Sequence, residues 1–170
     1  MIDPAFFFNT AFHGLAQIDS HKALPTVDLD RDTLMNTDFA AFRAFADAPM
    51  AMTAHIVFSC FDARPATISD VMIATIRQDI GFGGFLLSDD LSMQALPGSI
   101  ETRAAASVTA GCDAALHCNG VMDEMQLIAD HVPELTPLAY ERAERALSLR
   151  STARPSELDI KELSAKLLGR

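Results

Sequence analysis

Short apolar runs alternate along the chain with longer stretches in which apolar residues recur at helical spacing. Apolar runs of strand length occur at residues 50–58, 84–90 and 113–119. Helical spacing occurs at residues 37–48, 69–81, 99–111, 123–131 and 137–149. Strands that are apolar throughout and separated by helices are typical of a parallel sheet buried on both faces. The pattern therefore predicts an α/β fold of the doubly wound or barrel kind.

Residues at the ends of the helical stretches support these boundaries. Thr37 or Asp38 can cap the first helix and Ser69 the second, because side-chain oxygens satisfy free N–H groups there. Gly81 and Gly111 stand where two helices should end. The composition changes after residue 150. We expect residues 1–150 to form the α/β part of the chain, and residues 151–170 a linker and a charged terminal helix.

Composition limits the class of protein. With 170 residues, 49% of them hydrophobic and 21% charged, the chain has the make-up of a globular domain with one sizeable core. Thirteen basic against 23 acidic residues give a net charge of −10 without a basic cluster, which argues against a nucleic-acid partner. No Gly-rich phosphate loop or metal-ligand cluster is found in the sequence, so no cofactor and no metal are expected.

The cysteines and the N-terminal residues bear on location. Cys60, Cys112 and Cys118 are odd in number and lack C-x-x-C spacing, which favours reduced thiols over a disulfide framework. The first residues have no basic region, and their aromatic run is short, so we expect neither a signal peptide nor a membrane span. These features predict a cytoplasmic protein without a membrane partner.

Polar residues stand at the ends of the three expected strands: His55, the pair Asp89 and Asp90, and Asn119. In parallel α/β folds the carboxyl ends of the strands face the ligand. The pattern alone leaves alternatives open. Each residue also has a structural interpretation. An aspartate of the pair could cap a helix, His55 could be a hydrogen-bonded core histidine, and Asn119 could form a turn.

A second polar group lies on the loop at residues 13–25, where Asp19 and His21 flank Ser20. An isolated D-x-H of this kind is more often an Asx-turn beside an exposed histidine. Spacing by itself therefore does not decide between a structural and a functional role for this loop.

Four stretches occur in an order that resembles one family. They are "HGLAQIDSHKALP", "MTAHIVFSCFDARPATIS", "IRQDIGFGGFLLSDDLSM" and "AGCDAALHCN". Together they resemble the bacterial β-N-acetylhexosaminidases of glycoside hydrolase family 3, over residues from about 13 to about 119, with a helical continuation to about 150. The resemblance implies a (β/α)8 barrel and a small-molecule sugar substrate, the terminal β-linked N-acetylglucosamine of muropeptides.

The resemblance also assigns roles to residues. Asp89 would be the nucleophile, His21 the general acid/base, and Asp19 the group that orients His21. His55 and Asp90 would belong to the substrate-binding side, with Asp90 also holding the loop that follows its strand. An imidazole with an ordinary pKa near about 6.5 can carry a proton at neutral pH without the burial that a carboxylic acid needs. This is how such an enzyme departs from the usual pair of carboxyl groups.

The departures from the family pattern set a limit. Family members typically carry K-H-F-P-G-H-G before the D-S-H loop, but here the stretch is "FFNTAFHG", with Phe8 and Asn9 in place of the Lys-His pair. A full barrel takes about 250 residues and has eight strand-helix steps, whereas only three such steps are recognised in this sequence of 170 residues. We expect a C-terminal portion of the barrel, inactive alone and able to self-associate through exposed sheet edges. The main interpretation is an enzyme of peptidoglycan recycling. Its alternatives are an inactive remnant, an interaction module, or an amino-sugar binder without catalysis.

Overall fold

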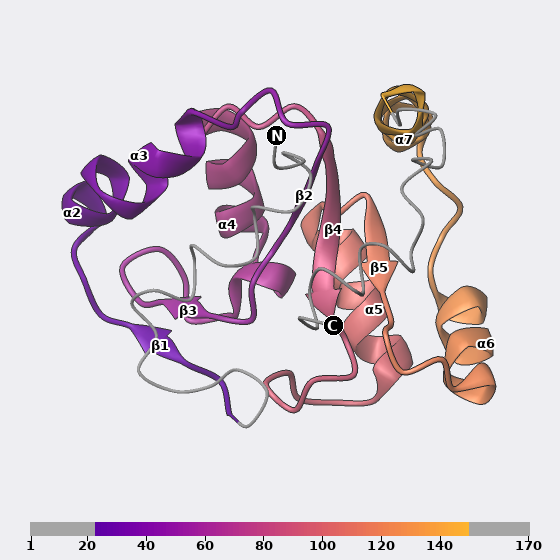
Figure 1. Cartoon of the computed structure of the whole chain (residues 1–170). Helices are drawn as coiled ribbons and strands as arrows, with labels where there is room; N and C mark the ends of the chain where they lie inside the picture. The colour runs from indigo at the N-terminus through magenta and orange to yellow at the C-terminus, as the bar shows by residue number, and fades with distance from the viewer. Residues whose placement is uncertain (1–22, 150–170) are drawn as a thin grey trace, which may run out of the picture.

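The computed structural model describes residues 23–149, in which parallel strands lie beside helices (Figure 1). In chain order the elements are β1 Thr26–Val27, α2 Arg31–Asn36, α3 Asp38–Arg43, β2 Met50–Met52, β3 Val57–Phe58, the 3-10 helix η3 Ala66–Ile68, α4 Asp70–Ala74, the π-helix η4 Thr75–Asp79, β4 Phe85–Asp90, α5 Ile100–Ala110, β5 Ala114–Leu116, α6 Met122–His131 and α7 Pro137–Ser148. The expected terminal helix at 151–170 lies outside the described residues.

Both sheets are parallel, which confirms the expected α/β class. Strands β2, β4 and β5 form one sheet with β4 in the centre, and β1 pairs with β3 in a second. Met52 pairs with Leu87, and Leu87 pairs with Ala114, so these three side chains share one face of the sheet. Within each sheet, the connection from one parallel strand to the next contains helix, as a crossover connection requires.

The strand expected at 50–58 is interrupted, so this prediction was wrong in its extent. β2 follows β4 as far as Thr53, whose N–H donates to the carbonyl of Leu87 at 3.0 Å. The chain then turns, with the N–H of Ile56 bonded to the carbonyl of Ala54 at 2.9 Å. β3 continues in the other sheet beside β1. A continuous apolar run does not reveal such a turn, because both halves are buried.

The helix expected at 37–48 is likewise shorter than predicted. α3 ends at Arg43, and a separate helix, α2, precedes it. Asp30 caps α2 by accepting a hydrogen bond from the N–H of Thr33 at 2.8 Å. Thr37 makes no cap hydrogen bond from its side chain, because its hydroxyl donates back to the carbonyl of Thr33 at 2.7 Å. Phe45 is therefore outside the helix and 42% exposed.

The helix expected at 69–81 begins as predicted. The hydroxyl of Ser69 accepts from the N–H of Met72 at 3.1 Å, and α4 continues directly into η4. Asp62 braces this start by accepting from the Ser69 hydroxyl at 2.5 Å and from Arg64. Burial raises the pKa of the Asp62 carboxyl, but the hydrogen bonds from Arg64 and Ser69 outweigh it and lower the pKa to about 2.

The core lies between β4 and the helices. Leu86 of β4 is buried with Met72 and Ile73 of α4 in the larger of two apolar clusters, and Cys112 joins them. Burial raises the pKa of the Cys112 thiol to about 12. α5 ends where predicted, at Gly111, whose φ of +114° is left-handed and suits glycine.

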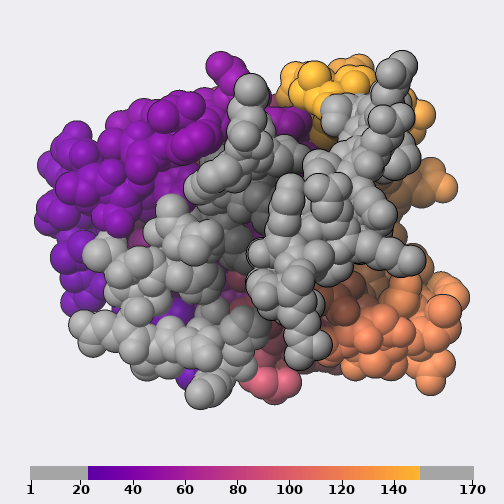
Figure 2. Space-filling view, in the orientation of Figure 1, coloured from indigo at the N-terminus to yellow at the C-terminus, as the bar shows by residue number. Residues whose placement is uncertain are grey.

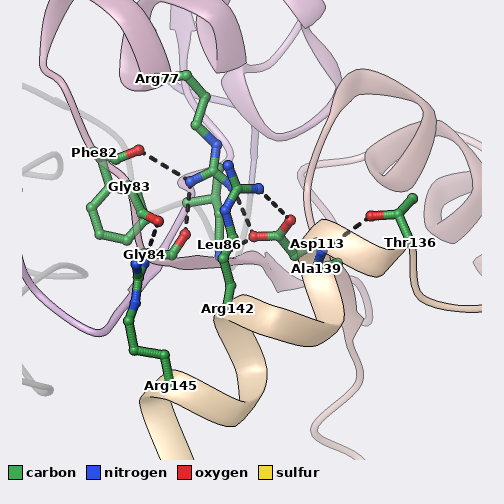
Figure 3. Close-up of polar contacts among 10 residues, drawn as sticks. All are labelled: Arg77, Phe82, Gly83, Gly84, Leu86, Asp113, Thr136, Ala139, Arg142 and Arg145. Atoms are coloured by element: carbon green, nitrogen blue, oxygen red, sulfur yellow. Dashed lines mark hydrogen bonds and ion pairs between the residues drawn. The ribbon is translucent and has the colours of Figure 1, made fainter.

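A buried ion cluster ties α7 to the beginning of the central strand (Figure 3). Asp113 Oδ2 lies 2.7 Å from Arg77, and its Oδ1 lies 2.8 Å from Arg142. The same carboxylate accepts from the N–H of Leu86 at 2.8 Å, while Arg77 also donates to the carbonyl of Gly84 at 2.7 Å. All of these groups lie near the amino ends of β4 and β5, where parallel α/β folds place stabilising contacts and not ligands.

Exposed apolar side chains are concentrated in α6, α7 and the residues beside them, the orange and yellow segments of Figure 2. They are Val121, Met122, Met125, Leu127, Leu135, Leu138, Tyr140, Leu147 and Leu149. A cavity of about 440 Å³ lies between these helices, α5 and β5. Among residues 23–149 no helix combines the length and the apolar character needed to cross a bilayer.

A candidate active site

The carboxyl end of β4 places a carboxylate in a closely packed setting. Asp89 is 4% exposed, and Ser88 before it is fully buried. The neighbouring strand β2 contributes the residues just beyond its end, Thr53 and His55, which are also buried. Thr67, from η3, completes the group. Five buried polar residues from three segments therefore lie where the sequence predicts a site.

Asp89 is fixed on one side and free on the other. Its backbone N–H donates to the Thr53 hydroxyl at 3.0 Å, and its Oδ1 accepts from the N–H of Asp90 at 2.8 Å. Its Oδ2 is buried, and no group of residues 23–149 donates a hydrogen bond to it. An unpaired carboxylate oxygen in a buried place is costly to folding. A buried polar atom without a partner needs an explanation, and a role in ligand binding or reaction is one of them.

Asp90 has a different use. Its Oδ1 accepts from the N–H groups of Ser92 and Cys118, both at 3.1 Å, and its Oδ2 accepts from the Ser92 hydroxyl at 2.6 Å. Burial raises the pKa of the Asp90 carboxyl, but these hydrogen bonds outweigh it and leave the pKa below its ordinary value. Asp90 thus holds the loop after β4 against the end of β5, as expected from the sequence.

His55 is 0% exposed and is bonded on both sides of its ring. Its Nδ1 lies 2.8 Å from the Thr67 hydroxyl, and its Nε2 lies 2.9 Å from the backbone carbonyl of Asp90. Burial lowers the pKa of this imidazole, although the Asp90 carbonyl and the nearby carboxylates oppose the effect. The ring is thus a hydrogen-bonded core histidine, the alternative that the sequence left open, and it lies directly beside the candidate site.

The structure brings together three of the five predicted site residues. Asp89, Asp90 and His55 meet at the carboxyl ends of β2 and β4, whereas Asp19 and His21 lie outside the described residues. Asn119 is exposed in the loop after β5. Within residues 23–149, no three or more His, Cys, Asp or Glu side chains are grouped so that they could hold a metal ion.

Sequence reasoning missed two threonines and one histidine near this site. The hydroxyl of Thr53 donates to that of Thr67 at 3.0 Å, and both are buried. Their only sequence signal was their place in "MTAHIVFSCFDARPATIS". His117, at the end of β5, has a side chain only 6% exposed, and its Nε2 lies 3.3 Å from a carboxylate oxygen of Glu124 without hydrogen-bond geometry.

Known sequences similar to this chain share one name, β-hexosaminidase. A β-hexosaminidase of Neisseria gonorrhoeae is 40% identical over 121 residues, which are 67% of this chain and 34% of that protein. A β-hexosaminidase of Aromatoleum aromaticum is 33% identical over 153 residues, 87% of this chain and 43% of that protein. The chain therefore spans less than half the length of these curated relatives.

Solved structures agree with the sequences. NagZ from Neisseria gonorrhoeae, in complex with N-trifluoroacetyl-D-glucosamine, matches with a TM-score of 0.68 and 34% identity, over 79% of this chain and 40% of that one. A family 3 β-N-acetylglucosaminidase from a Paenibacillus strain matches with a TM-score of 0.59 and 28% identity, over 80% of this chain and 28% of that one. The parallel strands and flanking helices are thus part of a (β/α)8 barrel, as the resemblance implied.

The family profile described as "Glycosyl hydrolase family 3 N terminal domain" matches residues 9–149, most of the chain. This match includes every element that the structure describes. The chain therefore belongs to glycosyl hydrolase family 3.

Proposed function

We propose that this chain is the nucleophile-bearing part of a β-N-acetylhexosaminidase that releases terminal β-linked N-acetylglucosamine with retention of configuration. The observation that carries the proposal is the orphaned Oδ2 of Asp89, buried at the carboxyl end of a central parallel strand. Relatives named β-hexosaminidase support the reaction class, and a related enzyme solved with an N-acylglucosamine supports the substrate class.

In this reaction Asp89 attacks the anomeric carbon while His21 donates a proton to the leaving oxygen. The bond to the leaving group breaks, and a covalent glycosyl-enzyme forms on Asp89. His21, now neutral, removes a proton from a water molecule that attacks the same carbon, and Asp89 leaves as a carboxylate. Asp19 holds the imidazole and stabilises its protonated form. Two inversions give net retention.

The surroundings of Asp89 suit a nucleophile. One carboxylate oxygen of Asp89 is held by the N–H of Asp90. The backbone of the strand therefore sets the direction from which the carboxylate attacks. The other oxygen has no described donor to weaken its nucleophilicity. His55 and Asp90 were assigned to substrate binding from the resemblance, and their polar atoms are bonded to protein groups. We infer that His55 and Asp90 support substrate binding indirectly, because they hold the Asp89 side chain in position from the protein side.

The remainder of the barrel is needed for turnover. β5 is an edge of the described sheet, and the apolar residues of α6 and α7 next to it are exposed. A barrel has no free edges, since its first and last strands pair. The chain alone is accordingly inactive, and it self-associates through β5 and this apolar surface unless further barrel strands cover them.

The cellular setting completes the proposal. Cys60, Cys112 and Cys118 are free thiols, which suits a reducing compartment. Together with the family resemblance, this supports a cytoplasmic role in peptidoglycan recycling, where muropeptides present terminal N-acetylglucosamine. An inactive remnant or interaction module of the same fold is the second candidate, and the exposed apolar residues of α6 and α7 favour it.

The deciding experiment restores the barrel. The segment of the Neisseria gonorrhoeae β-hexosaminidase that precedes the counterpart of His13 is fused in front of His13, so that Asp19 and His21 of this chain are retained in the fusion. We expect hydrolysis of an aryl N-acetyl-β-glucosaminide, and loss of that hydrolysis in Asp89→Asn. The matched control Asp123→Asn, at an exposed acid on α6, should keep full activity. A folded fusion without activity would favour the remnant.

A further inference from the structure

A chain of hydrogen bonds starts on one residue of the Asp89–Asp90 pair and ends on the other. The N–H of Asp89 donates to Thr53 Oγ1 at 3.0 Å, and the Thr53 hydroxyl donates to Thr67 Oγ1 at 3.0 Å. The Thr67 hydroxyl lies 2.8 Å from His55 Nδ1, and His55 Nε2 lies 2.9 Å from the carbonyl oxygen of Asp90. The five residues thus form a closed ring, which we call the relay.

With a neutral His55, only one arrangement of protons satisfies the relay. The Asp90 carbonyl can only accept, so His55 Nε2 must carry a proton and donate it. Each threonine hydroxyl has one proton, and Thr53 uses its proton on Thr67. Thr67 therefore donates to Nδ1, which must be unprotonated. A second proton on His55 would make Nδ1 a donor to Thr67. The Thr67 hydroxyl would then have to donate to Thr53, and the buried Thr53 hydroxyl proton would have no acceptor in the relay.

The relay and its neighbours hold the backbone polar groups of the Asp89–Asp90 pair. The Asp89 carbonyl accepts from the Ser88 hydroxyl at 2.8 Å, and the Asp90 N–H is used by Asp89 Oδ1. With the Asp89 N–H and the Asp90 carbonyl held by the relay, the free polar atom that is left on Asp89 is its Oδ2. Such complete bonding restricts the carboxylate to one direction.

We propose that Thr53, Thr67 and neutral His55 are positioning residues that aim the carboxylate of Asp89 through this relay. None of the three needs to touch the substrate. The role as an aiming device rests on the proposed function of Asp89, whereas the proton arrangement of the relay does not. The two parts are therefore tested by different measurements.

The first measurement reads the protons of His55 directly in the 170-residue chain. Side-chain ¹⁵N spectra at neutral pH, in solution or in the solid state if the chain assembles, distinguish protonated from unprotonated ring nitrogens, and His55→Gln identifies the resonances. We expect an unprotonated Nδ1 and a protonated Nε2. Thr67→Val should shift the Nδ1 resonance because its donor is lost, and Thr67→Ser should restore it. A protonated Nδ1, or a Thr67→Val spectrum like that of the wild type, would overturn the relay.

The second measurement reads aiming in the barrel-completing fusion. We expect Thr67→Val to lower kcat by about tenfold to a hundredfold with little change in KM, because a slightly misdirected nucleophile still permits binding. Thr67→Ser should recover most of kcat. Thr75→Val, at a buried threonine of η4 outside the relay, is the matched control and should stay within about twofold of the wild type.

The outcomes separate the two claims. Equal kcat values in Thr67→Val and Thr75→Val would overturn the aiming role. A fusion without activity, but with His55 in the expected form, would contradict the proposed function and leave the relay as a structural feature only. Loss of folding in Thr67→Val, detected by circular dichroism, is resolved by Thr53→Ser and Thr67→Ser, which keep a hydroxyl at each position. If both serine variants fold but still lose kcat by the tenfold or more expected of Thr67→Val, the hydroxyl groups do not act as proposed and the relay is wrong.

Discussion

Removal of the Asp113 carboxylate should destabilise the fold strongly. The Asp113 side chain is 6% exposed and lies between Arg77 and Arg142, whose side chains are 16% and 18% exposed. Asp113→Ala leaves two largely buried guanidinium groups that repel each other, and it deprives the Leu86 N–H of its acceptor. Breaking a buried pair by removal of one partner typically costs about 3–5 kcal/mol. That is a large part of the roughly 5–15 kcal/mol by which a domain is stable.

The assay is urea unfolding followed by circular dichroism, with the free energy of unfolding extrapolated to water. Asp113→Asn keeps an oxygen for the Leu86 N–H and should fall between Ala and the wild type. Asp79→Ala is the matched control, because it removes an exposed ion pair with Arg31 and should cost less than about 1 kcal/mol. A loss below about 1 kcal/mol for Asp113→Ala would refute the claim that this cluster anchors α7.

Three further predictions follow from single positions. Gly84→Ala should lower the melting temperature, since its Cβ would lie 2.3 Å from the carbonyl oxygen of Ala48; circular dichroism checks this, and an unchanged value would contradict it. The Asp62 carboxyl has a pKa of about 2, below its ordinary 3.8, so it stabilises the fold fully above pH about 4 and loses this effect as the pH falls toward 2. The difference in unfolding free energy between wild type and Asp62→Asn should then shrink over that interval, and a constant difference would oppose the assignment. Cys112 should react with iodoacetamide far more slowly than exposed Cys60 at pH 8, as mass spectrometry of the labelled peptides can show.

The sequence predicted the elements whose signals are local. Ser69 and Gly111 marked helix ends correctly because caps depend on a few neighbouring residues. The strand that ends at Asp90 was recognised because a buried run stops at two charged residues there. The break after β2 was not foreseen, since the turn at residues 54–56 depends on which strand each half pairs with.

The site was predicted only in part, for a similar reason. Its position at strand ends followed from the pattern, and the roles of its residues came from the resemblance to a family. The link from Thr53 through Thr67 to His55 joins positions up to 14 residues apart, and no periodicity signals which hydroxyl will meet which ring. The pairing of Asp113 with Arg77 and Arg142 likewise depends on tertiary packing that the sequence pattern does not encode.

The central claim is that Asp89 is the nucleophile, and covalent trapping tests it most directly. The barrel-completing fusion is incubated with a fluorinated N-acetylglucosaminide that forms the glycosyl-enzyme faster than water removes it, and the labelled peptide is identified by mass spectrometry. We predict a label on Asp89 in the peptide that includes "LLSDDLSM", absent in Asp89→Asn. A label on Asp90 or on any other residue would contradict the account.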